Sequence, residues 1–135
     1  MFALEVRDHI MIAHSLKGEA FGPAQKLHGA TFVIDAAFFS PQLGPNGIVI
    51  DIGLASTALS EILAPINYQN LDDLPQFSDR TSTTEVLAKY IFDRLAEACA
   101  AGTLGEDAQG VSRLKVTLNE SHVARAWYEA DLPNA

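Results

Sequence analysis

The feature that most constrains the fold is the stretch from Phe21 to Ile34, where a turn-rich approach leads into an apolar run. Gly22 and Pro23 precede His28, and the β-branched and aromatic residues 31–34 that follow are typical of a strand. His28 is therefore expected at the entrance of a strand, next to a glycine that allows a ligand or another backbone segment to come close.

A second β-type run, residues 2–14, ends in another histidine, His14. A catalytic zinc typically takes three protein ligands and leaves a fourth position open. If residues alternate along each strand, Glu120 and His122 share one face near the end of the chain. A zinc site made of His14, His28 and His122 is therefore geometrically possible. The alternative is that these are ordinary, hydrogen-bonded histidines at strand ends.

The remaining patterns predict six elements in the order ββααββ, with a hairpin at each end and a pair of helices between them. The strand-like runs are 2–14, 29–39, 114–118 and 123–132. A first helix follows the apolar run 48–53 and ends at Pro65, because proline cannot continue a helix. A second helix begins after Ser82 or Thr83, with Glu85 at capping-box spacing from Ser82, and ends near residues 100–102.

Composition narrows the classes of protein that the chain can belong to. Its 135 residues fit one domain, 1–135, which buries roughly 68% of its unfolded surface. No apolar stretch is long enough to cross a membrane, and charges in residues 1–9 argue against a signal peptide. A net charge of −8 argues against nucleic acid as a partner, and the single cysteine, Cys99, excludes an internal disulfide. We expect a cytoplasmic protein.

Two further groups are candidates for ligand binding. Glu120 lies between two strand-like runs, where its carboxylate could accept two N–H donors from a heterocycle; the alternative is a solvated turn glutamate. Thr83, Thr84 and Glu85 could present hydroxyls and amides to a polar ligand at a helix N-terminus; the alternative is a plain cap. Cys99 falls late in a helix without a nearby histidine, and we interpret it as a packing residue.

Six short motifs, in consistent order and spacing, resemble the 6-pyruvoyl-tetrahydropterin synthase and 6-carboxy-tetrahydropterin synthase family. They are Ile12-Ala13-His14, Leu27-His28-Gly29-Ala30, Gly47–Asp51, Ile66–Asp72, Ser82–Glu85 with Leu87–Ile91, and Asn119-Glu120-Ser121. The resemblance runs nearly end to end. It implies the α+β tunnelling fold, in which a four-stranded antiparallel sheet carries two helices on one face. It also implies a homo-oligomeric barrel, commonly a hexamer of two trimers, whose closure removes exposed sheet edges.

The resemblance also implies roles for individual residues. His14 and His28 match two of the family's three zinc ligands, while the third position is Ala30. Glu120, together with the Thr83-Thr84-Glu85 motif, matches the residues that hold the pyrimidine edge of the pterin.

Other positions depart from the family pattern. Ala24 stands where the catalytic cysteine lies, and Asn67 and Tyr68 replace the aspartate–histidine pair. Alanine cannot transfer a proton, and a tyrosine near its ordinary pKa of about 10 is a poor base at neutral pH.

Two hypotheses follow from these departures. In the first, the chain is a divergent enzyme that binds a pterin or a related heterocycle. It would hold zinc with His14, His28 and His122, and act on a dihydroneopterin-type substrate as a lyase through Tyr68 or a metal-bound water. In the second, the chain is a non-catalytic pterin- or purine-binding module of the same fold. Fold alone decides neither hypothesis.

Overall fold

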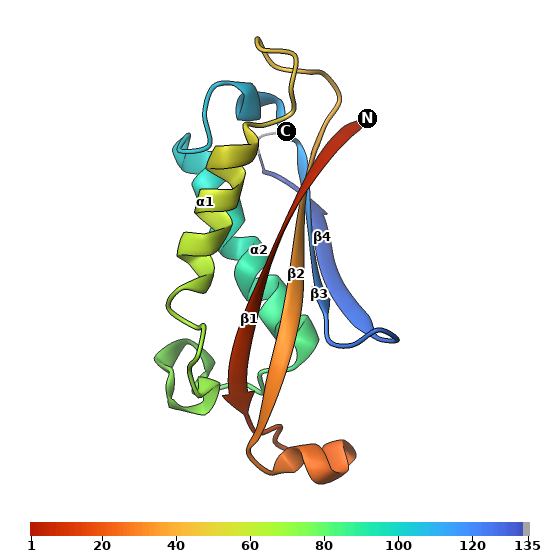
Figure 1. Ribbon diagram of the computed structural model, residues 1–135, viewed down its shortest axis with the longest axis vertical. Helices are drawn as coiled ribbons and strands as arrows, with labels where there is room; N and C mark the ends of the chain where they lie inside the picture. The colour runs from red at the N-terminus through yellow and green to blue at the C-terminus, as the bar shows by residue number, and fades with distance from the viewer. Residues whose placement is uncertain (134–135) are drawn as a thin grey trace.

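The computed structural model describes residues 1–133 and contains one four-stranded antiparallel sheet with two α-helices packed on it (Figure 1). The strands are β1 (Phe2–His14), β2 (His28–Ser40), β3 (Arg113–Asn119) and β4 (Arg125–Asp131), and they lie side by side in that order. The helices are α1 (Ile52–Leu63) and α2 (Thr84–Ala101). Four short 3-10 helices lie in the connections: η1 (Glu19–Gln25), η2 (Leu71–Asp73), η3 (Pro75–Phe77) and η4 (Asp107–Gly110). The predicted α+β fold with ββααββ order is confirmed.

The sheet has one face covered by the helices and one open face. Even-numbered residues of β2, such as Phe32 and Ile34, are fully buried against the helices, while Thr31 and Val33 face the other way. Burial of each large apolar side chain contributes about 1.5–3 kcal/mol, so this layer accounts for most of the stabilisation. The largest fully buried side chains are Ile10, Phe32, Ile34, Phe38, Ile50, Leu59, Ile66, Leu71, Leu87, Ile91, Leu95 and Leu104.

Both helices begin where a side chain caps them. The Asp51 carboxylate accepts a hydrogen bond from the backbone N–H of Leu54, and the Thr83 hydroxyl accepts one from Val86. α2 ends at Gly102, which adopts a left-handed conformation with φ of 75°. No helix within residues 1–133 is long and apolar enough to cross a membrane.

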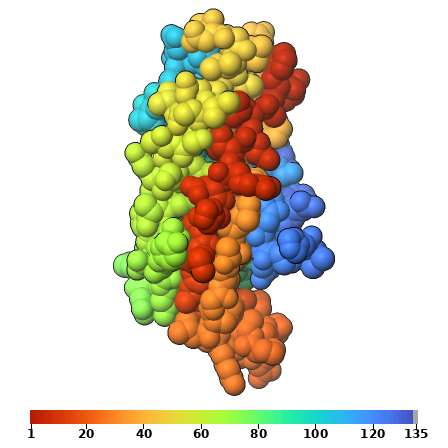
Figure 2. All heavy atoms as spheres, in the orientation of Figure 1, coloured from red at the N-terminus to blue at the C-terminus, as the bar shows by residue number. Residues whose placement is uncertain are grey.

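The β1–β2 hairpin is much longer than the β3–β4 hairpin. Residues 28–32 of β2 pair only with β1, since pairing with β3 starts at Val33. Figure 2 shows this long hairpin crossing the molecular surface between the helical layer and the C-terminal strands, with the orange η1 segment projecting from its end. The overhanging end of the hairpin is where His14 pairs with His28.

Candidate functional site

Two histidines face each other at the overhanging end of the hairpin. The ring centroids of His14 and His28 lie 4.7 Å apart, at an angle of 62°. His28 Nδ1 is 2.8 Å from the carbonyl oxygen of Lys26. Because a carbonyl can only accept, His28 must donate from Nδ1, which leaves the lone pair of Nε2 available to a ligand.

His14 is held by Ser82, which lies just before the N-cap of α2. It is buried, with 4% of its surface exposed, and its Nδ1 lies 3.1 Å from the hydroxyl oxygen of Ser82. Burial lowers the pKa of His14, and the neighbouring His28 lowers it further. The ring is therefore neutral at pH 7, which is the form that binds metals.

The predicted third histidine does not join this pair. His122 lies in the loop after β3 and lines a cavity with Arg7 and Arg125 on the open face of the sheet. Residues 1–133 contain no group of three metal-ligating side chains that could hold a metal ion. Alternation along β3 stops at Asn119, so the strand geometry assumed for Glu120 and His122 does not extend to them. The paired imidazoles suit zinc as donors, but the set within one chain is one protein ligand short.

Glu120 lies directly after β3, at the N-terminus of α2. Its Oε2 accepts a hydrogen bond from the Thr84 hydroxyl at 3.5 Å. Its charge also acts on His14, whose pKa it raises slightly against the larger effect of burial. The structure thus brings Glu120 and Thr84 to the histidine end of the sheet. The Thr83 oxygen is occupied by the helix cap, and Glu85 is exposed in the first turn of α2.

Tyr68 lies at the free edge of β1, beside Met11. Its backbone N–H donates to the Met11 carbonyl at 2.7 Å, while the side-chain oxygen of Asn67 accepts from the Met11 N–H at 3.0 Å. Tyr68 has a left-handed backbone, with φ of 60°, and 74% of its surface is exposed. No hydrogen bond or ring contact within the described chain joins it to His14, His28 or Glu120.

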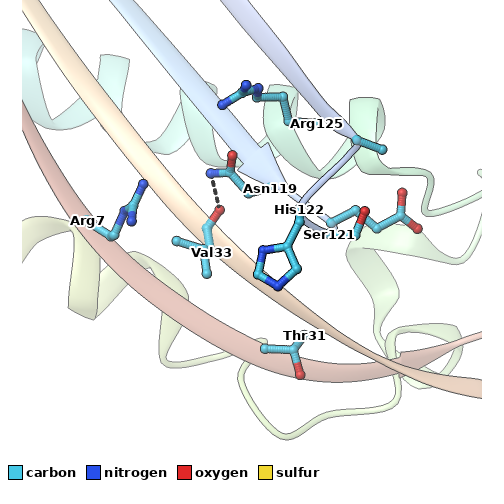
Figure 3. A pocket seen from close by; sticks show the side chains of 9 residues that line it. Arg7, Thr31, Val33, Asn119, Ser121, His122 and Arg125 are labelled. Atoms are coloured by element: carbon cyan, nitrogen blue, oxygen red, sulfur yellow. Dashed lines mark hydrogen bonds between the residues drawn. The ribbon is translucent and has the colours of Figure 1, made fainter.

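The open face of the sheet carries a second polar cluster. Asp35 is buried, and its two carboxylate oxygens accept from Arg7 Nε at 2.6 Å and Arg7 Nη2 at 2.9 Å. Asn119 Nδ2 also donates to Asp35, at 2.9 Å, and to the carbonyl oxygen of Val33, at 3.0 Å (Figure 3). These hydrogen bonds, led by those from Arg7, lower the pKa of Asp35. A cavity of about 640 Å³ lies beside this cluster.

Cys99 does not have the surroundings of a nucleophile. It is half-buried in the last turns of α2, and burial raises the pKa of its thiol to about 11. A thiol with this pKa is almost entirely protonated at pH 7, so it is a poor nucleophile.

Three features of the two polar clusters were not predicted from the sequence. Ser82 was considered as a cap, yet it contacts His14 instead. Asp72 accepts hydrogen bonds from the backbone and hydroxyl of Ser15, next to His14. The Arg7–Asp35 pair had one visible signal: Asp35 is the only charged residue in the apolar run 29–39.

The chain is similar in sequence to proteins of one known family. The profile of the 6-pyruvoyl tetrahydropterin synthase family matches residues 3–131. The 6-carboxy-5,6,7,8-tetrahydropterin synthase of Bacillus subtilis is 31% identical over 100 residues, which cover 70% of this chain and 65% of that protein. The 6-pyruvoyl tetrahydrobiopterin synthase of Poecilia reticulata is 34% identical over 76 residues. These residues cover 55% of this chain and 52% of that protein. The chain thus matches about half the length of that relative.

Solved structures show the same fold along the whole chain. The Caenorhabditis elegans 6-pyruvoyl tetrahydropterin synthase superposes with a TM-score of 0.78 and 24% identity, covering 96% of this chain and 95% of that one. The Plasmodium vivax 6-pyruvoyl tetrahydropterin synthase superposes with a TM-score of 0.75 and 17% identity, covering 97% of this chain and 99% of that one. At these identities the likeness establishes the fold. Together with the family profile over residues 3–131, it shows that the chain belongs to the 6-pyruvoyl tetrahydropterin synthase family.

Proposed function

We propose that this chain binds a pterin or a related heterocycle at the histidine end of the sheet. The observation that carries the proposal is the contact between Glu120 and Thr84, on the same side of the sheet as His14 and His28. Glu120 is exposed and makes no ion pair within residues 1–133. Its carboxylate can therefore accept two parallel N–H donors, such as those on the edge of an aminopyrimidine ring. The names of the relatives support a pterin as that ring.

The test is a titration of the purified protein with neopterin, followed by calorimetry. We expect Glu120→Ala to abolish binding, because the charge-assisted hydrogen bonds are lost. The matched control is Glu97→Ala, which removes a carboxylate from the exposed surface of α2. Size-exclusion chromatography of both variants checks that assembly is intact. Unchanged affinity in Glu120→Ala would refute the anchoring role.

The second candidate is a zinc-dependent lyase acting on a dihydroneopterin-type substrate. It is favoured by the His14–His28 pair, whose Nδ1 atoms both have hydrogen-bonding partners. The parent reaction is disfavoured by Ala24 and Ala30, and by Asn67, whose side chain is bound to the β1 backbone. Because these three positions lack the groups of the parent reaction, we infer that the chain is a member of the family that binds a pterin or a related heterocycle and does not use the usual cysteine-based chemistry.

One pair of measurements separates these candidates. Elemental analysis of the untagged protein and of His14→Ala gives the zinc content. Chromatography of 7,8-dihydroneopterin triphosphate after incubation gives turnover, with Tyr68→Phe as the test of the predicted catalytic tyrosine. Stoichiometric zinc that is lost in His14→Ala, together with turnover, would establish the lyase. Pterin binding without turnover would establish the binding module.

We also propose that the chain forms a homo-oligomer, in keeping with the hexamer that its family resemblance implies. The outer edges of β1 and β4 end the sheet on either side, and residues 2–9 of β1 have no further strand beside them within the described chain. Unpaired edges of this length favour pairing with another copy. Analytical ultracentrifugation tests this: a hexamer supports the proposal and a stable monomer contradicts it.

A further inference from the structure

We propose that the open face of the sheet holds a second binding site, which takes a phosphate group in the cavity beside Arg125. The cavity has a volume of about 640 Å³, and every strand contributes to its wall. Its polar side chains, apart from Glu120, are Arg7, Thr31, Asn119, Ser121, His122 and Arg125 (Figure 3). The site lies on the face opposite to the helices.

The charge of this cavity departs from that of the chain as a whole. The protein has a net charge of −8 and only nine lysines and arginines, yet two of these line one cavity together with a histidine. The Arg125 side chain forms no hydrogen bond or ion pair with any residue in the described part of the chain, although its charge helps to lower the pKa of Asp35. Arg7 uses Nε and Nη2 on Asp35, which leaves its Nη1 without such a partner. The wall thus offers cationic donors that the fold itself does not use.

The donor set fits a phosphate better than other ligand classes. A guanidinium group matches the oxygens of phosphate with two parallel N–H bonds, and the hydroxyls of Thr31 and Ser121 can supply further donors. The ring of His122 can supply a further N–H donor. A metal ion is disfavoured beside two arginines, because their charges repel it. An apolar ligand would leave these groups without water or partners.

Glu120 also lines the cavity, but one of its carboxylate oxygens contacts a residue on the helix side of the sheet. Its Oε2 is 3.5 Å from the hydroxyl of Thr84, the first residue of α2, and α2 packs on the opposite face of the sheet. The loop of residues 120–124 therefore serves both faces, with Glu120 reaching the helix side and His122 the open side. The anion could be a free phosphate or the phosphoryl group of a larger ligand, and the experiment must separate these two sources.

The first arm of the test uses inorganic pyrophosphate as the probe, titrated into the purified protein at low salt by calorimetry. We expect saturable binding that Arg125→Gln weakens by about tenfold or more, since a charge-assisted bidentate contact is lost. The matched control is Lys115→Gln on the same face, because Lys115 is stacked on Trp127 with its Nζ 4.5 Å from the ring centroid. Arg7 is left intact since it holds the buried Asp35.

The second arm compares neopterin with neopterin triphosphate. If the phosphate belongs to a larger ligand, the triphosphate binds more tightly, and Arg125→Gln removes that difference alone. If the anion is free, pyrophosphate binds and the two pterins do not differ. The proposal fails if neither probe shows a dependence on Arg125, or if Lys115→Gln weakens binding as much as Arg125→Gln. Failure of the pterin site would appear separately, as unchanged neopterin binding in Glu120→Ala.

Discussion

The two faces of the sheet carry polar clusters of opposite character. On the open face, the carboxylate of Asp35 accepts three hydrogen bonds from Arg7 and Asn119, so both of its oxygens have donors from the protein. On the helix side, the Nδ1 atoms of His14 and His28 contact protein groups, and within residues 1–133 their Nε2 atoms have no hydrogen-bonding partner. The first cluster is therefore built to hold the fold together, and the second is arranged to bind something else.

This difference shows how a structural cluster can be told from a site. Both clusters contain buried or half-buried polar groups, and within residues 1–133 no buried side-chain polar atom lacks a partner. Burial and polarity alone therefore do not distinguish them. The two clusters differ in which polar atoms already have hydrogen-bonding partners in the protein. Both carboxylate oxygens of Asp35 have such partners, whereas Nε2 of His28 and the exposed Glu120 carboxylate can still bind a ligand. Mutations at the histidine cluster should therefore affect ligand binding, and mutations at the Asp35 cluster should affect the stability of the fold.

The largest effect is expected from completing the histidine site. Ala30 lies on the same face as the pair, two residues from His28 and diagonal to His14 across the strands. We expect Ala30→His to raise zinc affinity by about a hundredfold, equivalent to about 2.7 kcal/mol, because it supplies a third imidazole. Competition with a chromogenic chelator measures the affinity. Thr31→His, on the opposite face, is the control, and equal gains in both variants would contradict the interpretation.

The next largest effect concerns the open face. Arg7→Met leaves the buried Asp35 carboxylate with Asn119 as its only donor, and we expect it to lower the free energy of unfolding. The loss is smaller than for a fully buried pair, because 67% of the Arg7 side chain is exposed. Chemical denaturation measures the change. Arg94→Met, which breaks an exposed pair on α2, should cost much less.

The same pair should make stability depend on pH. Arg7 holds the folded-state pKa of Asp35 below its ordinary value, so the stabilisation is complete above about pH 4 and is lost as the pH falls through the folded-state pKa. Asp35→Asn should therefore be less stable than the wild type at pH 7, and the gap should close in acid. Denaturation curves from pH 7 to pH 2 measure it. A gap that stays constant over this range would show that Asp35 acts through packing alone.

A smaller effect is expected from Ser82, the residue that positions His14. Ser82→Ala removes the partner of Nδ1, and we expect it to weaken zinc binding by about tenfold while neopterin binding stays the same. The ¹⁵N chemical shifts of the His14 ring should also show a mixture of tautomers, which a purely structural role would not produce. Ser78→Ala, on an exposed hydroxyl, serves as the control. An unchanged ring spectrum would remove Ser82 from this role.

The smallest effects are expected at two neighbouring threonines, of which one affects stability and the other affects ligand binding. Thr83→Ala removes the cap of α2 and should cost about 1 kcal/mol of stability, because the backbone N–H of Val86 loses its partner. Thr84→Ala should leave stability almost unchanged and weaken neopterin binding instead, since its hydroxyl contacts Glu120. Thermal unfolding and calorimetry of both variants measure the two effects. The same response in both variants would show that the cap and the site are not distinct.

The sequence by itself determined the elements of this fold. The run predicted at 2–14 is β1, and the runs at 29–39 and 114–118 differ from β2 and β3 by one residue at each end. These predictions succeed because β-branched and aromatic runs, prolines and caps act over a few residues. The six motifs also identified the family, which the profile over residues 3–131 confirmed. Glu120, Thr84, His14 and His28 were named as site residues before their positions were known, and their roles remain proposals.

Only the tertiary structure decided which polar groups meet. Arg7 reaches Asp35 because the β1–β2 register pairs these two residues, and that register is set by the whole hairpin. Ser82 contacts His14 across 68 residues because the segment that leads into α2 passes the overhanging end of the β1–β2 hairpin. His122 was expected to join the histidines, but the chain leaves strand geometry after Asn119 and puts it beside Arg125. The alternation of side chains along a strand predicts nothing beyond the end of that strand. The position of a side chain in a loop therefore depends on how distant segments pack together.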